Sequence, residues 1–396
     1  MSVQPDFRSP LTEIDLILSR VISSLVNPRD VSPETIATAL EQLTRARALL
    51  LDLAVIPEDG RPSRTLWRMG IESDRAGARV AFFRETDGTV DLFPLSWSLE
   101  DGESDRLPAG LVDRYLVDWL ATLPPDGDSW LYEALRELSG IWIAHDRESS
   151  LETLENSLIA AKISSPDRIH RVERTIATAL AHVALAGRAG AETLLIVQGG
   201  GEMTELALIE IPADPLSLSR RSIAFSRFEY GSETFTRHLL EHAIYPRWRA
   251  IVADSLPDLD SLDDHPLGRA LREAARLTLL ILQERSEFTS RLGDRAWTVH
   301  RAEVEREVIQ PFIGLLRQKV GFLLESSRKN LTENDRVIFC GDFFLSLWPL
   351  LSSALTVEFL PAPIVAPDSE TISPALFGLG RVPLYPSLED RSGNND

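Results

Sequence analysis

The stretch that decides the fold reads LLIVQGGGEMTELALIEI and spans residues 194–211. It starts with an apolar run, passes through three consecutive glycines at residues 199–201, and ends in a second apolar run. Two β-rich runs joined by a short glycine-containing segment predict a β-hairpin. Residues 69–83 repeat this arrangement around the polar segment 72–78. Two hairpins of one type, each near the start of half of the body, indicate two related lobes that face each other across a cleft.

The rest of the chain alternates short β-rich runs with amphipathic helices, a pattern typical of α/β architecture. The predicted strands are residues 79–83, 89–95, 141–145, 194–198, 206–211, 337–340 and 357–360. The predicted helices are residues 111–123, 153–161, 171–186, 233–252, 266–286 and 302–326.

Two Ser-Pro pairs, at residues 9–10 and 32–33, mark helix starts near the N-terminus. Apolar residues recur at helical spacing after each pair, so we expect an N-terminal helical hairpin over residues 1–55. Prolines, a glycine and charges over residues 56–65 predict a linker. The remaining expected divisions are lobe I at 66–187, lobe II at 188–384 and a disordered tail at 385–396.

The composition limits the partners that this protein can have. The 396 residues carry a formal net charge of −19, which disfavours binding to nucleic acid and to anionic membranes. A single cysteine, Cys340, excludes an internal disulfide and fits a reducing compartment. No apolar run reaches the length of a membrane span, and the N-terminus lacks the pattern of a secretory signal. We therefore expect a soluble, cytoplasmic protein with a protein as its partner.

Six short segments follow one another in a fixed order between about residues 66 and 381. They are GIESDRAGA at 70–78, VERTIATALA at 172–181, VQGGGE at 197–202, GSETFT at 231–236, RAEVE at 301–305 and CGDFFL at 340–345. In order and spacing they resemble the motifs GIDLGTTNS, NEPTAAALA, DLGGGT, GGEDFD, RAxFE and VGGSxR of the ATPase domain of DnaK-type heat-shock chaperones. These chaperones are members of the actin-like ATPase superfamily. The resemblance implies a two-lobed actin-like ATPase fold of duplicated ribonuclease-H-like lobes, without the family's peptide-binding domain.

The resemblance also implies a nucleotide site in the cleft. ATP or ADP is the candidate cofactor, although the sequence specifies no cofactor with certainty, and no catalytic or metal-binding residue is assigned. Three glycines can let backbone N–H groups approach a phosphate, but they also fit a plain hairpin turn that only preserves the fold. The candidate nucleotide-binding residues are Glu72, Arg75, Gly199, Gly200, Gly201, Glu233 and Gly341.

Several residues that the family uses for hydrolysis are replaced. The phosphate- and metal-contacting threonines of the first hairpin are Arg75 and Ala76, and the aspartate is the longer Glu72. In the second hairpin, Val197 replaces the metal-organising aspartate, and Glu202 replaces the threonine. A carboxylate at that position would repel a γ-phosphate. The phosphate-contacting lysine of the family has no counterpart, because no lysine precedes Lys162.

The expected adenosine pocket departs from the family as well. Arg276, Leu279 and Gln283 stand where the family grips adenine and ribose with Glu, Lys and Ser. Leu345 replaces the arginine that stacks on adenine. Asp342 replaces a glycine, and Phe343 would crowd the pocket.

These replacements predict a heat-shock-chaperone-like protein with a degenerate nucleotide site, which acts as a non-hydrolysing protein-binding, scaffold or regulatory factor. The alternative is a divergent ATP-binding protein or weak ATPase, acting as a nucleotide sensor or co-chaperone, in which Arg75 takes the role of the missing lysine. A third alternative is a zinc hydrolase, because His238 and His242 form an H-x-x-E-H pattern. That pattern needs a third ligand, for which the sequence offers no partner motif.

Overall fold

The computed structural model describes most of the chain from residue 66 onward. The described residues are 66–74, 77–86, 89–95, 97–99, 102–104, 106–108, 116, 118, 130–146, 151–185, 191–213, 218–250, 266–292, 295–359, 363–365, 373–385 and 388. The predicted helical hairpin (1–55), the linker (56–65), and nearly all of the helix at 111–123 and of the tail at 385–396 lie outside them.

Arg84–Asp91 belongs to a separate compact unit, in which the Arg84 guanidinium lies 2.8 Å from the Asp91 carboxylate. The larger unit comprises Trp67–Phe83 and Leu92–Asp396, and it contains the site described below.

The protein is of mixed α/β type, and its first mixed sheet begins with the hairpin expected around residues 72–78. The strands run in the order β3-β2-β1-β7-β8, and β6 pairs with β2. Only two residues connect β1 to β2, so these strands are antiparallel. β7 is parallel to both β1 and β8. The strands are β1 (Leu66–Asp74), β2 (Gly77–Thr86), β3 (Thr89–Pro94), β6 (Leu107–Pro108), β7 (Leu138–His145) and β8 (Ile169–Glu173).

The second mixed sheet contains the hairpin formed by residues 194–211. Its order is β11-β10-β9-β14-β15, with β10 antiparallel to both β9 and β11. β14 is parallel to β9 and to β15. The strands are β9 (Glu192–Gly199), β10 (Thr204–Ile211), β11 (Ile223–Phe228), β14 (Arg336–Cys340) and β15 (Ile364–Val365). Both sheets therefore place a hairpin on one side of their first strand and two parallel strands on the other.

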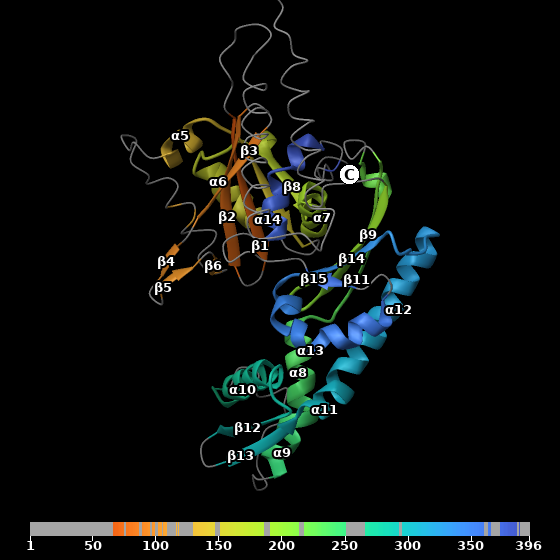
Figure 1. Ribbon diagram of the computed structural model, residues 1–396. Coiled ribbons are helices and arrows are strands. Elements are labelled where there is room, and N and C mark those ends of the chain that lie inside the picture. Colours follow the sequence, from red (N-terminus) through yellow and green to blue (C-terminus); the bar gives the residue numbers. More distant parts are fainter. Residues whose placement is uncertain are drawn as a thin grey trace, which may run out of the picture. The chain divides into compact units, whose positions relative to one another are not determined.

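Helices and two short hairpins complete the larger unit (Figure 1). The α-helices are α5 (Trp130–Arg136), α6 (Glu152–Ala160), α7 (Arg174–Leu185), α8 (Ser232–Leu239), α9 (Tyr245–Ala250), α10 (Pro266–Leu282), α11 (Arg301–Val304), α12 (Gln310–Ser327), α13 (Asp342–Glu358) and α14 (Pro374–Leu379). π-Helical turns at Leu240–Ile244 and Glu305–Ile309 join α8 to α9 and α11 to α12. The 3-10 turns are Pro166–Arg168, Arg220–Ser222 and Val382–Leu384. The hairpins are β4 (Trp97–Leu99) with β5 (Gly102–Ser104), and β12 (Glu287–Leu292) with β13 (Arg295–His300).

The structure confirms five of the predicted helices, with ends that differ by a few residues, and corrects two predictions. The helix expected from residue 171 begins at Arg174, because Ile169–Glu173 pairs with β7 as a strand. The strand expected at 357–360 is wrong over the described residues, because Val357 and Glu358 end α13 and Phe359 caps it. That helix buries Phe344, Leu347, Leu351 and other apolar side chains at helical spacing. A strand could not bury this set in one core, because its successive side chains alternate between two faces.

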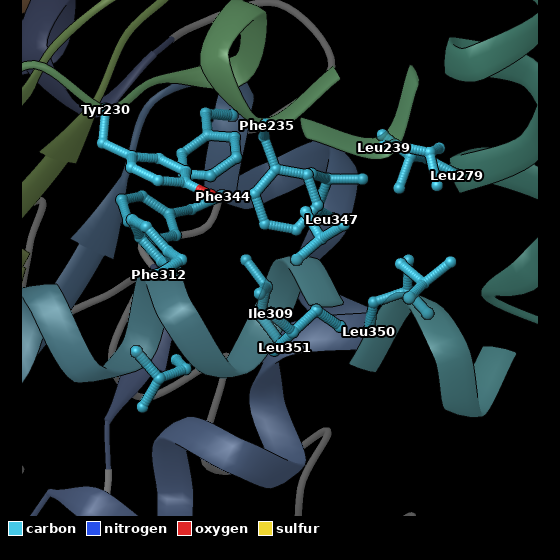
Figure 2. Close-up of a cluster of buried hydrophobic side chains, with 14 of the residues drawn as sticks. Tyr230, Phe235, Leu239, Leu279, Ile309, Phe312, Phe344, Leu347, Leu350 and Leu351 are labelled. Carbon is cyan, nitrogen blue, oxygen red and sulfur yellow. The ribbon is translucent and has the colours of Figure 1, made fainter. Parts of the chain in front are cut away.

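Each sheet has its own hydrophobic core. Around the first sheet, the Trp67 ring stacks on Trp130 with centroids 6.0 Å apart, and Phe93 lies 5.4 Å from Trp67. Beside the second sheet, Phe312 of α12 contacts Tyr230 and Phe235, and Figure 2 shows these rings with leucines of α13. No helix in the described part of the chain is long and apolar enough to cross a membrane.

Candidate functional site

A cavity of about 390 Å³ lies where β1, β9 and β14 end and where α7, α8 and α13 begin. Its size is that of a small-molecule pocket. Six of the seven candidate residues line it: Glu72, Gly199, Gly200, Gly201, Glu233 and Gly341. The seventh, Arg75, lies outside the described residues. The sequence motifs thus converge on one cavity in the larger unit.

Arg174, at the start of α7, occupies the centre of a buried charge network. Its side chain is 3% exposed, and its Nε lies 3.5 Å from a carboxylate oxygen of Glu72. Its Nη1 lies 3.4 Å from Asp146, and its Nη2 donates a hydrogen bond to the Ser73 carbonyl at 2.5 Å. Glu72 also accepts a hydrogen bond from the hydroxyl of Ser373. The protein's own side chains therefore satisfy the carboxylate that the sequence marks as a ligand-binding group.

A second ion-pair group lies at the start of α13. Asp342 pairs with Arg106 and has a carboxylate oxygen 3.9 Å from an Nη of Arg79. Arg79 in turn lies 3.8 Å from Glu72. The Asp342 side chain is 51% exposed, whereas those of Arg79 and Arg106 are 14% and 18% exposed. The guanidinium groups of Arg79 in β2 and of Arg106 just before β6 thus converge on one accessible carboxylate at the start of α13.

The glycine turn between β9 and β10 is tight and closely tied to α8. The Gly200 N–H donates to the Met203 carbonyl at 2.9 Å, and the carbonyls of Gly200 and Gly201 accept from Ser232 and Glu233 at 3.0 and 2.7 Å. The first amides of α8 are therefore used within the protein. A Cβ on Gly231 would lie 2.4 Å from the Gly201 carbonyl oxygen, which explains why glycine precedes this helix.

Carboxylates border the glycine turn. Glu202, Glu205 and Glu233 all line the cavity, and a Cβ on Gly201 would lie 3.4 Å from a carboxylate oxygen of Glu233. Among the described lining residues, six carboxylates face four guanidinium groups. The glycine side of the cavity is therefore unfavourable for the phosphates of a nucleotide.

The side chain of β9 that reaches the cavity is that of Gln198, which precedes Gly199. Val197, the counterpart of the family's aspartate in the motif comparison, is fully buried in the hydrophobic core. The Gln198 Oε1 accepts a hydrogen bond from the Cys340 thiol at 2.9 Å. Its Nε2 is buried and has no hydrogen-bond partner in the described part of the structure. Gln198 thus places an unused donor at the cavity.

Cys340 and Gly341 form the junction between β14 and α13. Burial raises the pKa of the Cys340 thiol to about 12, so the thiol stays protonated and can donate to Gln198. Gly341 has a φ of 90°, and a Cβ there would lie 2.3 Å from the Gly199 carbonyl oxygen. Glycine at position 341 therefore meets a conformational and steric requirement of the backbone.

The residues expected at the adenosine position are divided between the cavity and other parts of the structure. Arg276, Leu345 and Phe343 line the cavity, and the Phe343 ring also packs 5.4 Å from Phe312. Leu279 is buried in the core of the second sheet, and the Gln283 amide donates to the Ser346 carbonyl.

Three arginines that line the cavity were not among the residues predicted from the sequence: Arg79, Arg106 and Arg174. Arg174 gave a signal, because it stands where the quoted family motif has proline. Arg79 and Arg106 gave none, because they lie outside every matched motif and only the tertiary structure brings them to the cavity.

The H-x-x-E-H pattern lies on α8 and the π-helical turn that follows. His238 Nδ1 is 2.9 Å from the Tyr230 hydroxyl, and the rings of His238 and His242 are 5.8 Å apart. Burial lowers the pKa of His238 and raises that of Tyr230. The described residues contain no group of three His, Cys, Asp or Glu side chains that could hold a metal ion. The pattern therefore lacks its third ligand within that part of the chain.

Comparison with protein-family models and with curated proteins gives no match for this chain.

Proposed function

We propose that this chain is a relative of the DnaK-type ATPase domain that does not hydrolyse nucleotide and acts as a protein-binding, scaffold or regulatory factor. The observation that carries this proposal is the position of Arg174. It pairs with Glu72 and Asp146 inside the cavity, where a hydrolase would need carboxylates free to organise a metal ion and its waters. Because the carboxylates of Glu72 and Asp146 pair with this buried arginine, they are not free to organise a metal ion.

The strand order supports the fold part of the proposal. An actin-like ATPase fold consists of two related lobes, and both sheets here have the same order and the same pattern of parallel and antiparallel pairs. Helices α7 and α14 also pack closely, since a Cβ on Gly378 would lie 1.7 Å from the Ala177 carbonyl oxygen.

The charges around the glycine turn support the absence of hydrolysis. Phosphoryl transfer requires donors and cations that neutralise the developing charge on the transferred group. Glu202, Glu205 and Glu233 lie there instead. The net charge of −19 favours a protein partner over nucleic acid or an anionic membrane.

The test is a calorimetric titration of the full chain with ATP and with ADP, with and without Mg²⁺, alongside a phosphate-release assay. We expect no turnover above the rate without protein and no binding heat at micromolar nucleotide. Mg²⁺-dependent turnover that Arg174→Leu or Gly200→Val abolishes, with folding retained, would overturn the proposal.

The second candidate function is nucleotide sensing without hydrolysis, and the intact glycine turn favours it. Arg79, Arg106 and Arg174 supply guanidinium groups that line the cavity and can contact a phosphate in place of the family's lysine. Gly200→Val is the discriminating variant, because a Cβ on Gly200 has its nearest neighbour, the Met203 carbonyl oxygen, at 3.4 Å and so fits with small adjustments. Micromolar ATP binding without turnover, lost in Gly200→Val at unchanged stability, would favour the sensor.

A further inference from the structure

One accessible carboxylate of the cavity is held by two arginines. Asp342 is about half exposed, and its partners Arg79 and Arg106 are mostly buried. The two arginines come from the first sheet and the segment beside it, whereas Asp342 begins α13 (Figure 1). Arginine pairs of this kind are common receptors for carboxylates, because the planar guanidinium presents several donors in a fixed geometry.

The same cavity is lined by Gln198, whose side-chain N–H group has no acceptor in the described part of the chain. Gln198 is 3% exposed. The orientation of the amide is fixed by the Cys340 thiol, which donates to its Oε1. A buried donor left without an acceptor costs about 1–3 kcal/mol, so an oxygen-bearing ligand at this point would recover free energy.

We propose that Arg79 and Arg106 form a carboxylate-binding site that Asp342 occupies as an internal competitor. The external ligand is a small dicarboxylate, which places one carboxylate on the two arginines and the other at Gln198. The cavity volume of about 390 Å³ accommodates a molecule of this size. The proposal uses only the cavity residues and does not depend on the function proposed above.

The ligand displaces the ion pair that is less buried, which is the pair of Asp342 with the two arginines. Solvent-exposed ion pairs contribute about 0–1 kcal/mol, so Asp342 can turn toward water at little cost. The Arg174–Glu72 pair is buried, and separating it would leave charges without compensation. The ligand therefore replaces Asp342 while the network around Arg174 stays in place.

The experiment is a calorimetric titration of the full chain with succinate at low ionic strength. Asp342→Asn removes the competing charge and keeps the shape of the side chain, so we expect it to bind succinate at least about tenfold more tightly than the unchanged protein. Adding Arg106→Gln to this variant should abolish the gain. Asp91→Asn is the matched control, because Asp91 is similarly exposed, pairs with one arginine and lies outside the cavity.

Each outcome decides for or against the proposal. Equal affinity of the Asp342→Asn variant and the unchanged protein, or a gain that survives Arg106→Gln, would overturn it, provided that thermal unfolding shows both variants folded. Acetate should bind at least about tenfold more weakly than succinate, and inorganic phosphate no more tightly than acetate. If acetate or inorganic phosphate binds as tightly as succinate, the proposal that the ligand is a dicarboxylate is wrong. ATP binding without succinate binding would reject this proposal alone, whereas ATP turnover would reject the function proposed above alone.

Discussion

The two sheets of the larger unit share a strand order but bring opposite net charge to the cavity between their strand ends. The first sheet and its adjoining segments supply Arg79, Arg106 and Arg174, which outnumber the two carboxylates Glu72 and Asp146. The second supplies the glycine turn, bordered by Glu202, Glu205 and Glu233. The two sheets thus repeat one arrangement of strands, whereas the side chains at the edges that face the cavity differ. The order of strands depends on buried apolar residues, and the chemistry of the cavity depends on a few polar ones that can change independently.

The largest expected effect comes from removing Arg174, the arginine at the start of α7 that follows the last strand of the first sheet. Arg174→Leu leaves the buried Glu72 carboxylate without its closest guanidinium, and deleting one partner of a buried pair costs about 3–5 kcal/mol. We expect a loss at the lower end of this range, because Arg79 and Ser373 still contact Glu72. Urea denaturation followed by circular dichroism measures the change.

Arg171→Leu is the matched control for that loss. Arg171 lies three residues earlier, pairs with Glu155 through two hydrogen bonds of 2.6 and 2.5 Å, and is 41% exposed. Its removal should cost no more than about 1 kcal/mol, as for other exposed ion pairs. Equal losses in the two variants would show that the Arg174 network contributes no more than a surface pair.

The next effect tests the second sheet at the junction of β14 and α13. Gly341→Ala places a Cβ in a left-handed conformation and against the Gly199 carbonyl, so we expect a loss of at least about 2 kcal/mol. Gly200→Ala, in the neighbouring turn, should change stability by less than about 1 kcal/mol, because its Cβ meets nothing closer than 3.4 Å. The same denaturation experiment compares the two, and similar losses would contradict the steric account.

The sequence predicted the parts of this fold that have strong local patterns. The hairpin at residues 194–211 and the long helices around 266–286 and 302–326 appear where apolar periodicity places them. β8 escaped prediction because IHRVE carries three charged or polar residues, and its strand state depends on pairing with β7. The apolar C-terminal part of α13 resembled a strand, since only the core contacts of the whole helix reveal its period.

The candidate site was predictable in position but only partly in chemistry. The motifs predicted that the candidate residues share one site, and the six that the structure describes all line one cavity. The ion pairs around Arg174 and Asp342 involve residues separated by up to 263 positions in the chain, from Arg79 to Asp342, and no local pattern encodes such contacts. The side of β9 that faces the cavity is likewise set by packing, which is why Gln198 rather than Val197 lies there.

The smallest expected effect compares the corresponding parallel strand pairs of the two sheets. In the first sheet, the Ser139 hydroxyl of β7 donates to the Trp67 carbonyl of β1 at 2.7 Å. In the second, the Asp335 carboxylate, just before β14, accepts from the Thr193 N–H of β9 at 2.7 Å and from the Thr332 N–H at 2.6 Å. Burial alone would raise the pKa of Asp335, but these hydrogen bonds outweigh burial and lower it.

A lowered pKa in the folded state means that the ionised Asp335 contributes stability above its unfolded pKa, near 4, and that this contribution is lost as the pH falls through the folded value. Asp335→Asn should therefore cost about 1–2 kcal/mol at pH 7 and progressively less below pH 4, where the wild-type carboxyl becomes neutral too. Ser139→Ala should cost about 1 kcal/mol at both pH values, because no ionisation is involved. Urea denaturation at pH 7 and at pH 3 measures both. A pH-independent loss in Asp335→Asn would mean that the carboxylate acts through its shape alone, and the two sheets would then join their parallel strands in the same uncharged way.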